Sequence, residues 1–196
     1  MARAKSEDKR GALMAAATRV IAAQGLSAPT AVIAREAGVA NGSLFTYFET
    51  KADLFGQLLL ELKTGMAAAS LEGIPVEAPP YEQYSRLWSN WMRWGALHPA
   101  KRRALALLDA SDDIAPSTRA AAQATMIEIA RTLEQARAHG PMRDAPMEFV
   151  AAVANSVAQT TMDFMTSDPA HADEHSKAGF DALRGMLGIL FFYAQK

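Results

Sequence analysis

Apolar residues near the beginning of the chain recur with the 3.6-residue period of an α-helix. The first set predicts a helix over residues 7–24, which Gly25 ends. Its apolar positions are Leu13, Ala16, Ala17, Val20 and Ile21. A second set, around Ile33, predicts a short helix. Thr30 is expected to cap this helix, and Gly38 to end it, because glycine accepts the left-handed backbone that most residues resist.

A third apolar set follows directly. Leu44, Tyr47 and Phe48 have the i, i+3, i+4 spacing of a buried face and predict a helix that begins near residue 41 or 42. Two short helices joined by a glycine turn form a helix-turn-helix, whose second helix fits the major groove of DNA. The segment 29–54 therefore indicates DNA binding, although similar helix pairs also occur in helical subdomains without a DNA role.

The rest of the chain is also predicted to be helical. Thr50 and Asp53 form a pair like a capping box before a fourth helix, whose apolar side has five members. These are Leu54, Phe55, Leu58, Leu59 and Leu62. The proline-rich segment 73–80 interrupts the pattern. Five more helices are predicted over residues 81–97, 100–109, 116–138, 145–166 and 173–194. Pro99 and Pro116 suit helix starts, and Asp144 suits an N-cap.

Residues 7–63 resemble the DNA-binding region of the tetracycline-repressor (TetR) family of bacterial transcription regulators. The matching residues are Ile33, Ala34, Ala37, Gly38, Val39, Gly42, Leu44, Tyr47, Phe48, Lys51 and Leu54. The resemblance implies an all-α fold of about nine helices. Residues 1–50 are then the helix-turn-helix domain and residues 51–196 the ligand-binding and dimerisation domain, with the helix over 51–70 connecting them.

The predicted DNA-contacting residues lie on the outward side of the second helix and at its flanks. They are Thr30, Ala40, Asn41, Gly42, Ser43, Phe45, Thr46, Tyr47 and Lys51. The resemblance places Ser43 and Thr46 nearest the bases, and Tyr47 and Lys51 on phosphate. The family usually has a hydroxyl residue where this chain has Ala40. Phe45 replaces a commoner tyrosine and offers a thymine methyl group an apolar contact.

Charge and composition agree with this interpretation. Residues 1–51 carry a net charge of +3, whereas the remainder carries −4, so the basic part contains the helix-turn-helix. The chain has no cysteine, which excludes disulfides and thiolate metal sites and suits the cytoplasm. No apolar run approaches the ~18 residues of a membrane span. We therefore expect a cytoplasmic protein.

The C-terminal part is predicted to bind an apolar or aromatic effector, because aromatic and methionine side chains with a few polar groups are typical of small-molecule pockets. The candidates are Tyr84, Trp88, Trp91, Met92, Met126, Phe149, Asn155 and Gln159. Alternatively, the apolar members are ordinary core, and Asn155, Gln159 and Asp163 form a solvated edge or an interface contact. The sequence identifies neither the effector nor the operator.

A homodimer is also expected, because one helix pair cannot place two recognition helices one DNA turn apart. The last two helices are the predicted interface, since the final one has more apolar surface than one face needs. Its members include Ile189, Leu190, Phe191 and Phe192. His171 and His175 at i, i+4 resemble a metal pair, but their connection is rich in charged surface residues, so no metal and no cofactor is predicted.

Together these observations predict a repressor that leaves a palindromic operator when a small molecule binds. An activator or an effector-independent regulator with the same fold is one alternative. A ligand carrier or enzyme built on a helical bundle is the other. The sequence contains no nucleophile elbow, phosphate loop or zinc spacing, so no catalytic residue is predicted.

Overall fold

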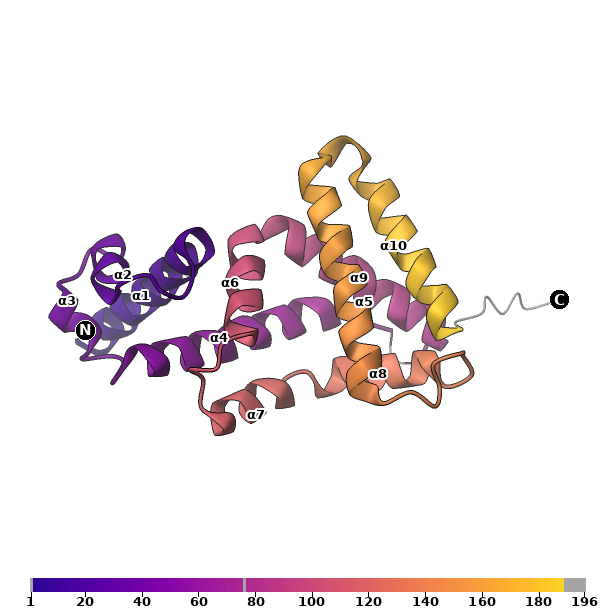
Figure 1. The fold of residues 1–196 in the computed structure, drawn as a ribbon, viewed down its shortest axis with the longest axis horizontal. Coiled ribbons are helices and arrows are strands. Elements are labelled where there is room, and N and C mark those ends of the chain that lie inside the picture. The colour runs from indigo at the N-terminus through magenta and orange to yellow at the C-terminus, as the bar shows by residue number, and fades with distance from the viewer. Residues whose placement is uncertain (1, 76, 189–196) are drawn as a thin grey trace. The chain divides into compact units, whose positions relative to one another are not determined.

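Every regular element that the structure describes is a helix (Figure 1). The structure, a computed structural model, describes residues 2–75 and 77–188. The helices are α1 (Ala2–Gln24), α2 (Thr30–Glu36), α3 (Asn41–Leu44), α4 (Lys51–Leu71), α5 (Pro80–Leu97), α6 (Pro99–Asp109), α7 (Pro116–Ala124), α8 (Ile127–Arg137), α9 (Met147–Ser167), the 3₁₀ turn η1 (Pro169–His171) and α10 (Ala172–Leu187). The predicted all-α fold is confirmed.

The described residues form two compact units. The first contains the residues up to Gly65 and His98–Thr125, and the second contains Met66–Leu97 and the residues from Met126 onward. The helix α6 belongs to the first unit because it packs against α1. The predicted boundary at residue 50 concerns function, whereas these two units are defined by packing. The functional division therefore stays a prediction. Among the described helices, none is long and apolar enough to cross a membrane.

The first unit is built around the apolar side of α1. All five predicted core positions of this helix are buried, and four of them have no exposed surface. The predicted apolar side of α4 is buried as well. Gly25 directly follows α1 and has a φ of 80°, a value that residues with a side chain rarely adopt. The local period therefore placed this core correctly.

Polar contacts attach α6 and α7 to α4 within the first unit. The ammonium group of Lys63 is buried and lies 2.8 Å from Oδ1 of Asp109 and 3.1 Å from Oε1 of Gln123. Arg119 donates to the backbone oxygens of Asp109 and Ser111. Because a buried ammonium without partners is costly, these contacts hold the three helices in one arrangement.

The second unit has its own core around Trp88 of α5. The indole nitrogen of Trp88 donates to the backbone oxygen of Ser176 at 3.0 Å. The helices α9 and α10 run as an antiparallel pair, joined by η1 (Figure 1). A Cβ atom on Gly179 of α10 would lie 2.2 Å from Oγ1 of Thr161 and 2.9 Å from the Trp88 ring. Glycine is therefore needed for this close approach.

Some predicted helix boundaries are wrong. The single helix predicted over 116–138 is two helices, because the chain turns at Thr125 and Met126, where the hydroxyl of Thr125 donates to the backbone oxygen of Ala122 at 2.7 Å. The described part thus contains ten α-helices rather than about nine. The last helix ends at Gly188, whose φ is 72°. The predicted continuation over 189–194 lies outside the described residues.

Two predicted caps are also wrong. The N-cap residue of α2 is Pro29, so Thr30 is the first helical residue and caps nothing. The N-cap residue of α9 is Pro146 rather than Asp144. In both cases a proline fixes an extended backbone directly before the helix, and the polar residue lies outside the capping position. The capping pair before α4 is confirmed, since the amide of Asp53 donates to Oγ1 of Thr50 at 3.0 Å.

Arg137 holds the loop between α8 and α9. Its side chain is 8% exposed. The Nη1 atom donates to the backbone oxygens of Met142, Arg143 and Ala145, and Nε donates to Oε2 of Glu134 at 2.6 Å. One guanidinium group therefore satisfies three loop carbonyl groups and also has its charge balanced.

Replacing Arg137 by methionine should lower the free energy of unfolding by about 2–4 kcal/mol, because the loop carbonyl groups would no longer have their shared, largely buried donor. Urea denaturation at one fixed protein concentration measures this change. Arg131 on the same helix is the control, since its side chain is 61% exposed and its one ion-pair partner among the described residues is Glu128. Arg131→Met should change stability by no more than about 0.5 kcal/mol, and equal effects would contradict the assigned role of Arg137.

Candidate nucleic-acid interface

The turn between α2 and α3 depends on Gly38, whose φ is 70°. The amide of Gly38 donates to the backbone oxygen of Arg35, and the amide of Val39 donates to that of Ala34 at 2.9 Å. These bonds satisfy carbonyl groups that the end of α2 leaves open. The predicted role of this glycine is confirmed, and the turn sets the direction in which α3 leaves α2.

The helix α3 is shorter than predicted, with four residues from Asn41 to Leu44. The helical path nevertheless continues as turns: the amide of Tyr47 donates to the backbone oxygen of Leu44 at 3.0 Å, and that of Phe48 to the same oxygen at 3.1 Å. Aromatic and β-branched residues at 45–47 are weak helix formers, which accounts for the early end. Leu44 and Phe48 are buried, as predicted.

Burial of Leu44 and Phe48 leaves the other side of this segment in contact with solvent. Each of the nine predicted DNA-contacting residues is exposed or half-buried. They are Thr30, Ala40, Asn41, Gly42, Ser43, Phe45, Thr46, Tyr47 and Lys51. Phe45 has 47% of its surface exposed, which is unusual for a large apolar side chain. The surface is thus available to DNA, and the individual contacts stay predictions.

Two cations beside this surface lie over aromatic rings. The ammonium nitrogen of Lys51 lies 5.3 Å from the centre of the Phe55 ring, at the start of α4. The guanidinium of Arg10 lies 5.7 Å from the centre of the Phe48 ring and donates to Oε1 of Gln57 at 2.6 Å. A cation at a helix N-terminus gains nothing from the helix dipole, whereas a phosphate is attracted by both. Lys51 is therefore well placed for a phosphate contact.

The structure adds Arg35 as a candidate that the sequence analysis did not single out. Arg35 is exposed in the last turn of α2 and makes no hydrogen bond or ion pair through its side chain with the described residues. Arg19, in contrast, pairs with Glu36 at 3.0 Å. The sequence signal for Arg35 is a basic residue on the outward side of α2. The structure adds that Arg19, and not Arg35, has an acidic partner among the described residues.

The predicted ligand residues fall into two groups. Tyr84, Trp88 and Met92 lie together in the core of the second unit, and Trp91 packs against them. Burial raises the pKa of the Tyr84 phenol, so this side chain is neutral at any physiological pH. Trp91 has a buried indole nitrogen without a hydrogen-bond partner in the described structure.

The second group lies closer to solvent. Phe149 has 56% of its surface exposed, and Asn155 is exposed on the same helix, α9. Met126 and Gln159 are half-buried. The structure thus brings the α5 residues together in a core and places Phe149 and Asn155 on an outer surface. Their assignment to a ligand site remains a prediction.

The two histidines near the end of α9 share one carboxylate. Nδ1 of His171 lies 2.9 Å from Oδ2 of Asp168, and Nε2 of His175 lies 3.2 Å from the same atom. In the described part of the chain, no group of three or more histidine, aspartate, glutamate or cysteine residues could hold a metal ion. The histidine pair therefore forms local contacts that link η1 and α10 to the end of α9.

These observations define the class of protein. A glycine-turned helix pair presents an exposed helical turn with cations beside it, and a separate helical unit follows. This is the arrangement of a helix-turn-helix DNA-binding protein.

Comparison with known proteins defines the family. Residues 13–58 match the model of the bacterial regulatory proteins of the tetR family. The N-terminal part of the chain is therefore a DNA-binding domain of this family, and the chain is a DNA-binding transcription regulator rather than an enzyme.

Solved structures resemble the chain over most of its length. A protein of Shewanella sp. PV-4 assigned to the tetR family of transcription regulators is 26% identical, with a TM-score of 0.79 over 89% of this chain and 95% of its own. A TetR family regulator of Marinobacter aquaeolei VT8 is 20% identical, with the same TM-score over 93% and 96%. NalD of Pseudomonas aeruginosa is 20% identical, with a TM-score of 0.61 over 92% and 98%.

Replacing Lys51 by glutamine should weaken DNA binding equally for all sequences. The logarithmic dependence of affinity on salt should become shallower by about 0.9 for each phosphate that the protein no longer neutralises, and hence by about 1.8 for a dimer. Fluorescence anisotropy with duplex DNA at several salt concentrations measures both effects.

Lys101 provides the matched control, because it is an exposed lysine on α6 outside the predicted surface. Lys101→Gln removes the same charge and should leave the salt dependence unchanged. If both variants shift it equally, the effect of Lys51 is one of net charge and not of a phosphate contact.

Proposed function

We propose that this protein is a homodimeric repressor that leaves a palindromic operator when a small molecule binds to its second unit. The observation that carries the proposal is the exposed turn of α3 in a tetR-family domain, joined along the chain to a separately packed helical unit. NalD, which has a similar fold, is the secondary repressor of the MexAB-OprM multidrug efflux pump. This likeness supports a repressor role but identifies neither the operator nor the effector.

The dimer proposal rests on an outward stripe shared by α9 and α10. On α9 the stripe repeats at helical spacing and includes two exposed phenylalanines. Its exposed members are Phe149, Ala152, Ser156, Thr160 and Phe164. On α10, Ala178, Ala182 and Gly185 are exposed at i, i+4 and i+7. Small residues allow helices to approach closely, so two copies of this face can form a four-helix bundle.

Replacing Ala182 by arginine should therefore disrupt the dimer. A charged side chain in the middle of such a face has no partner, so we expect the dissociation constant to rise by about 30-fold or more. Sedimentation equilibrium measures the change. Ala121→Arg on α7 introduces the same charge at another exposed alanine and should have no effect. A monomeric wild-type chain at micromolar concentration would refute the dimer.

An effector has to displace side chains in the core around α5, because that core is tightly filled. A Cβ atom on Gly95 would lie 2.2 Å from the sulfur of Met162, which is fully buried. Methionine side chains rearrange easily, which suits a site that opens for a ligand. The unpartnered indole nitrogen of Trp91 supplies a hydrogen-bond donor for a polar group of the effector.

We infer that α4 transmits the effect to the DNA-binding unit, since this helix has residues in both units. An effector lowers DNA affinity only by the difference between its affinities for the two conformations. A shift in the tilt of α4 changes the spacing of the two recognition segments in the dimer. This change of spacing is the proposed cause of release.

Two measurements test regulation. Deleting the gene should raise expression of a reporter placed behind the operator, whereas lower expression would indicate an activator. A screen of aromatic and apolar compounds for release of labelled DNA should then identify effectors, and no release by any of them would favour an effector-independent regulator.

For a compound that releases DNA, Trp91→Phe should raise the half-maximal concentration by about tenfold, because phenylalanine cannot donate the hydrogen bond of the buried indole. The affinity for DNA alone should not change. The double variant Trp88→Ala, Trp91→Ala should abolish release, but it also removes core volume, so the phenylalanine variant is the decisive one. Unchanged release by both variants would sink the assignment.

A further inference from the structure

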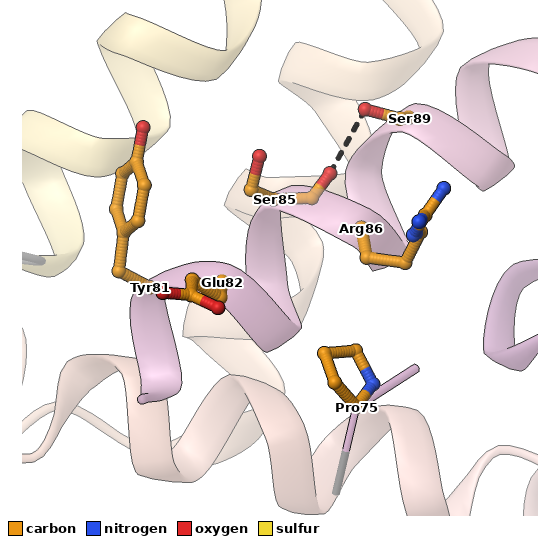
Figure 2. A pocket seen from close by; sticks show the side chains of 6 residues that line it. All are labelled: Pro75, Tyr81, Glu82, Ser85, Arg86 and Ser89. Carbon is orange, nitrogen blue, oxygen red and sulfur yellow. Dashed lines mark hydrogen bonds between the residues drawn. The ribbon is translucent and has the colours of Figure 1, made fainter. Parts of the chain in front are cut away.

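A second candidate binding site lies on the outer side of α5. It is an open groove of about 370 Å³, lined by Pro75 and by five residues of α5 (Figure 2). The five residues are Tyr81, Glu82, Ser85, Arg86 and Ser89. They occupy i, i+1, i+4, i+5 and i+8 and thus form one stripe of the helix. The stripe is distinct from the buried one that contains Tyr84 and Trp88, so the groove is separate from the core.

The groove contains two opposite charges that do not pair with each other. Glu82 and Arg86 are four residues apart, with the acid nearer the helix N-terminus, which is the favourable order for an ion pair. Neither side chain makes a hydrogen bond or ion pair with another described residue. Comparable pairs elsewhere do form: Glu134 and Arg137 lie 2.6 Å apart, and Lys177 and Asp181 lie 2.8 Å apart. Both charges in the groove are therefore available to a ligand.

The remaining walls supply hydroxyl groups and apolar surface. Oγ of Ser89 donates to the backbone oxygen of Ser85 at 2.9 Å, which leaves the lone pairs of this hydroxyl for a ligand donor (Figure 2). The ring of Tyr81 is held edge-to-face against Phe180, with 5.8 Å between ring centres. The Pro75 ring forms the other side of the groove. A ligand group of moderate size can contact both rings.

This set of groups selects a ligand with both charges. A simple anion is attracted by Arg86 but repelled by Glu82, and the reverse holds for a simple cation. A carboxylate can form two parallel hydrogen bonds with a guanidinium group, and an ammonium can donate to a carboxylate one helical turn away. The volume lies in the range of small-molecule sites.

We propose that the groove binds a zwitterionic small molecule of the amino-acid type, with its carboxylate on Arg86, its ammonium on Glu82 and an apolar side chain between Pro75 and Tyr81. The site goes beyond the effector site proposed in the core, since its polar lining does not suit a purely apolar compound. All its lining residues belong to the second unit, so binding of a probe to the groove can be measured without DNA.

The test uses three related probes on the full chain: L-phenylalanine, 3-phenylpropionate without the ammonium, and phenethylamine without the carboxylate. Saturation-transfer NMR and calorimetry should show binding of L-phenylalanine, with each singly charged analogue about fivefold weaker, as expected for one partly exposed charge contact. No binding of L-phenylalanine up to its solubility limit would overturn the proposal, as would equal binding of all three probes.

Variants assign each charge. The Arg86→Gln variant should bind L-phenylalanine and phenethylamine equally, because the carboxylate no longer has a partner. The Glu82→Gln variant should bind L-phenylalanine and 3-phenylpropionate equally, because the ammonium no longer has a partner. Arg93→Gln is the control on the same helix, since Arg93 lies 3.6 Å from Glu72 and outside the groove. If wild-type selectivity persists in both groove variants, the ligand binds elsewhere.

The readout also separates this proposal from the regulatory one. Probe binding is measured without DNA, so a chain that fails to bind an operator can still bind the zwitterion. Conversely, the groove variants can lose zwitterion binding and still be released from DNA by an effector. That result would leave the proposed core site unaffected. The unfolding midpoints of the three variants should match the wild type, because all three side chains are partly or fully exposed.

Discussion

Burial of Leu44 and Phe48 determines which side of α3 is available to DNA. Both side chains are sealed from solvent, so the intervening Phe45 and Thr46 are held outward. The left-handed turn at Gly38 sets the direction from which this segment enters, and the hydrogen bond between Asp53 and Thr50 begins α4 directly after it. The apolar contacts that fold the first unit and the surface predicted to contact DNA thus lie on opposite sides of one short helical segment.

The second unit differs from the first in how its core is packed. Its core depends on contacts that admit no extra atoms, such as the approach of Gly179 to Thr161, and on Arg137 as a donor to a whole loop. A tightly filled interior responds to a ligand by switching between arrangements rather than by gradual deformation. The same interior leaves two polar groups, Trp91 Nε1 and Ser70 Oγ, buried without partners in the described structure. Such unpaired groups are suited to a site that a ligand completes.

Local features of the fold could be read from the sequence, and long-range ones could not. The periods of α1 and α4, the stop at Gly38 and the prolines at the starts of α6 and α7 depend on neighbours in the chain. The break at Thr125, the contacts of Arg137 and the packing of α6 on α1 depend on partners that no local pattern reveals. The candidate DNA surface was recognisable because its residues are contiguous. The groove at Arg86 was not recognisable from the sequence. The spacing of Glu82 and Arg86 favours an ion pair, and only the structure shows that the two side chains do not pair.

We expect two copies of this chain to read DNA through the α3 segment. A selection of genomic fragments by the purified protein, followed by footprinting of the enriched fragments, tests this expectation. We expect a two-fold symmetric site whose half-sites lie one or two helical turns of DNA apart, and we expect Tyr47→Ala combined with Lys51→Ala to lose that footprint. No enrichment of any sequence, or an unchanged footprint with the double variant, would show that the α3 segment does not read DNA.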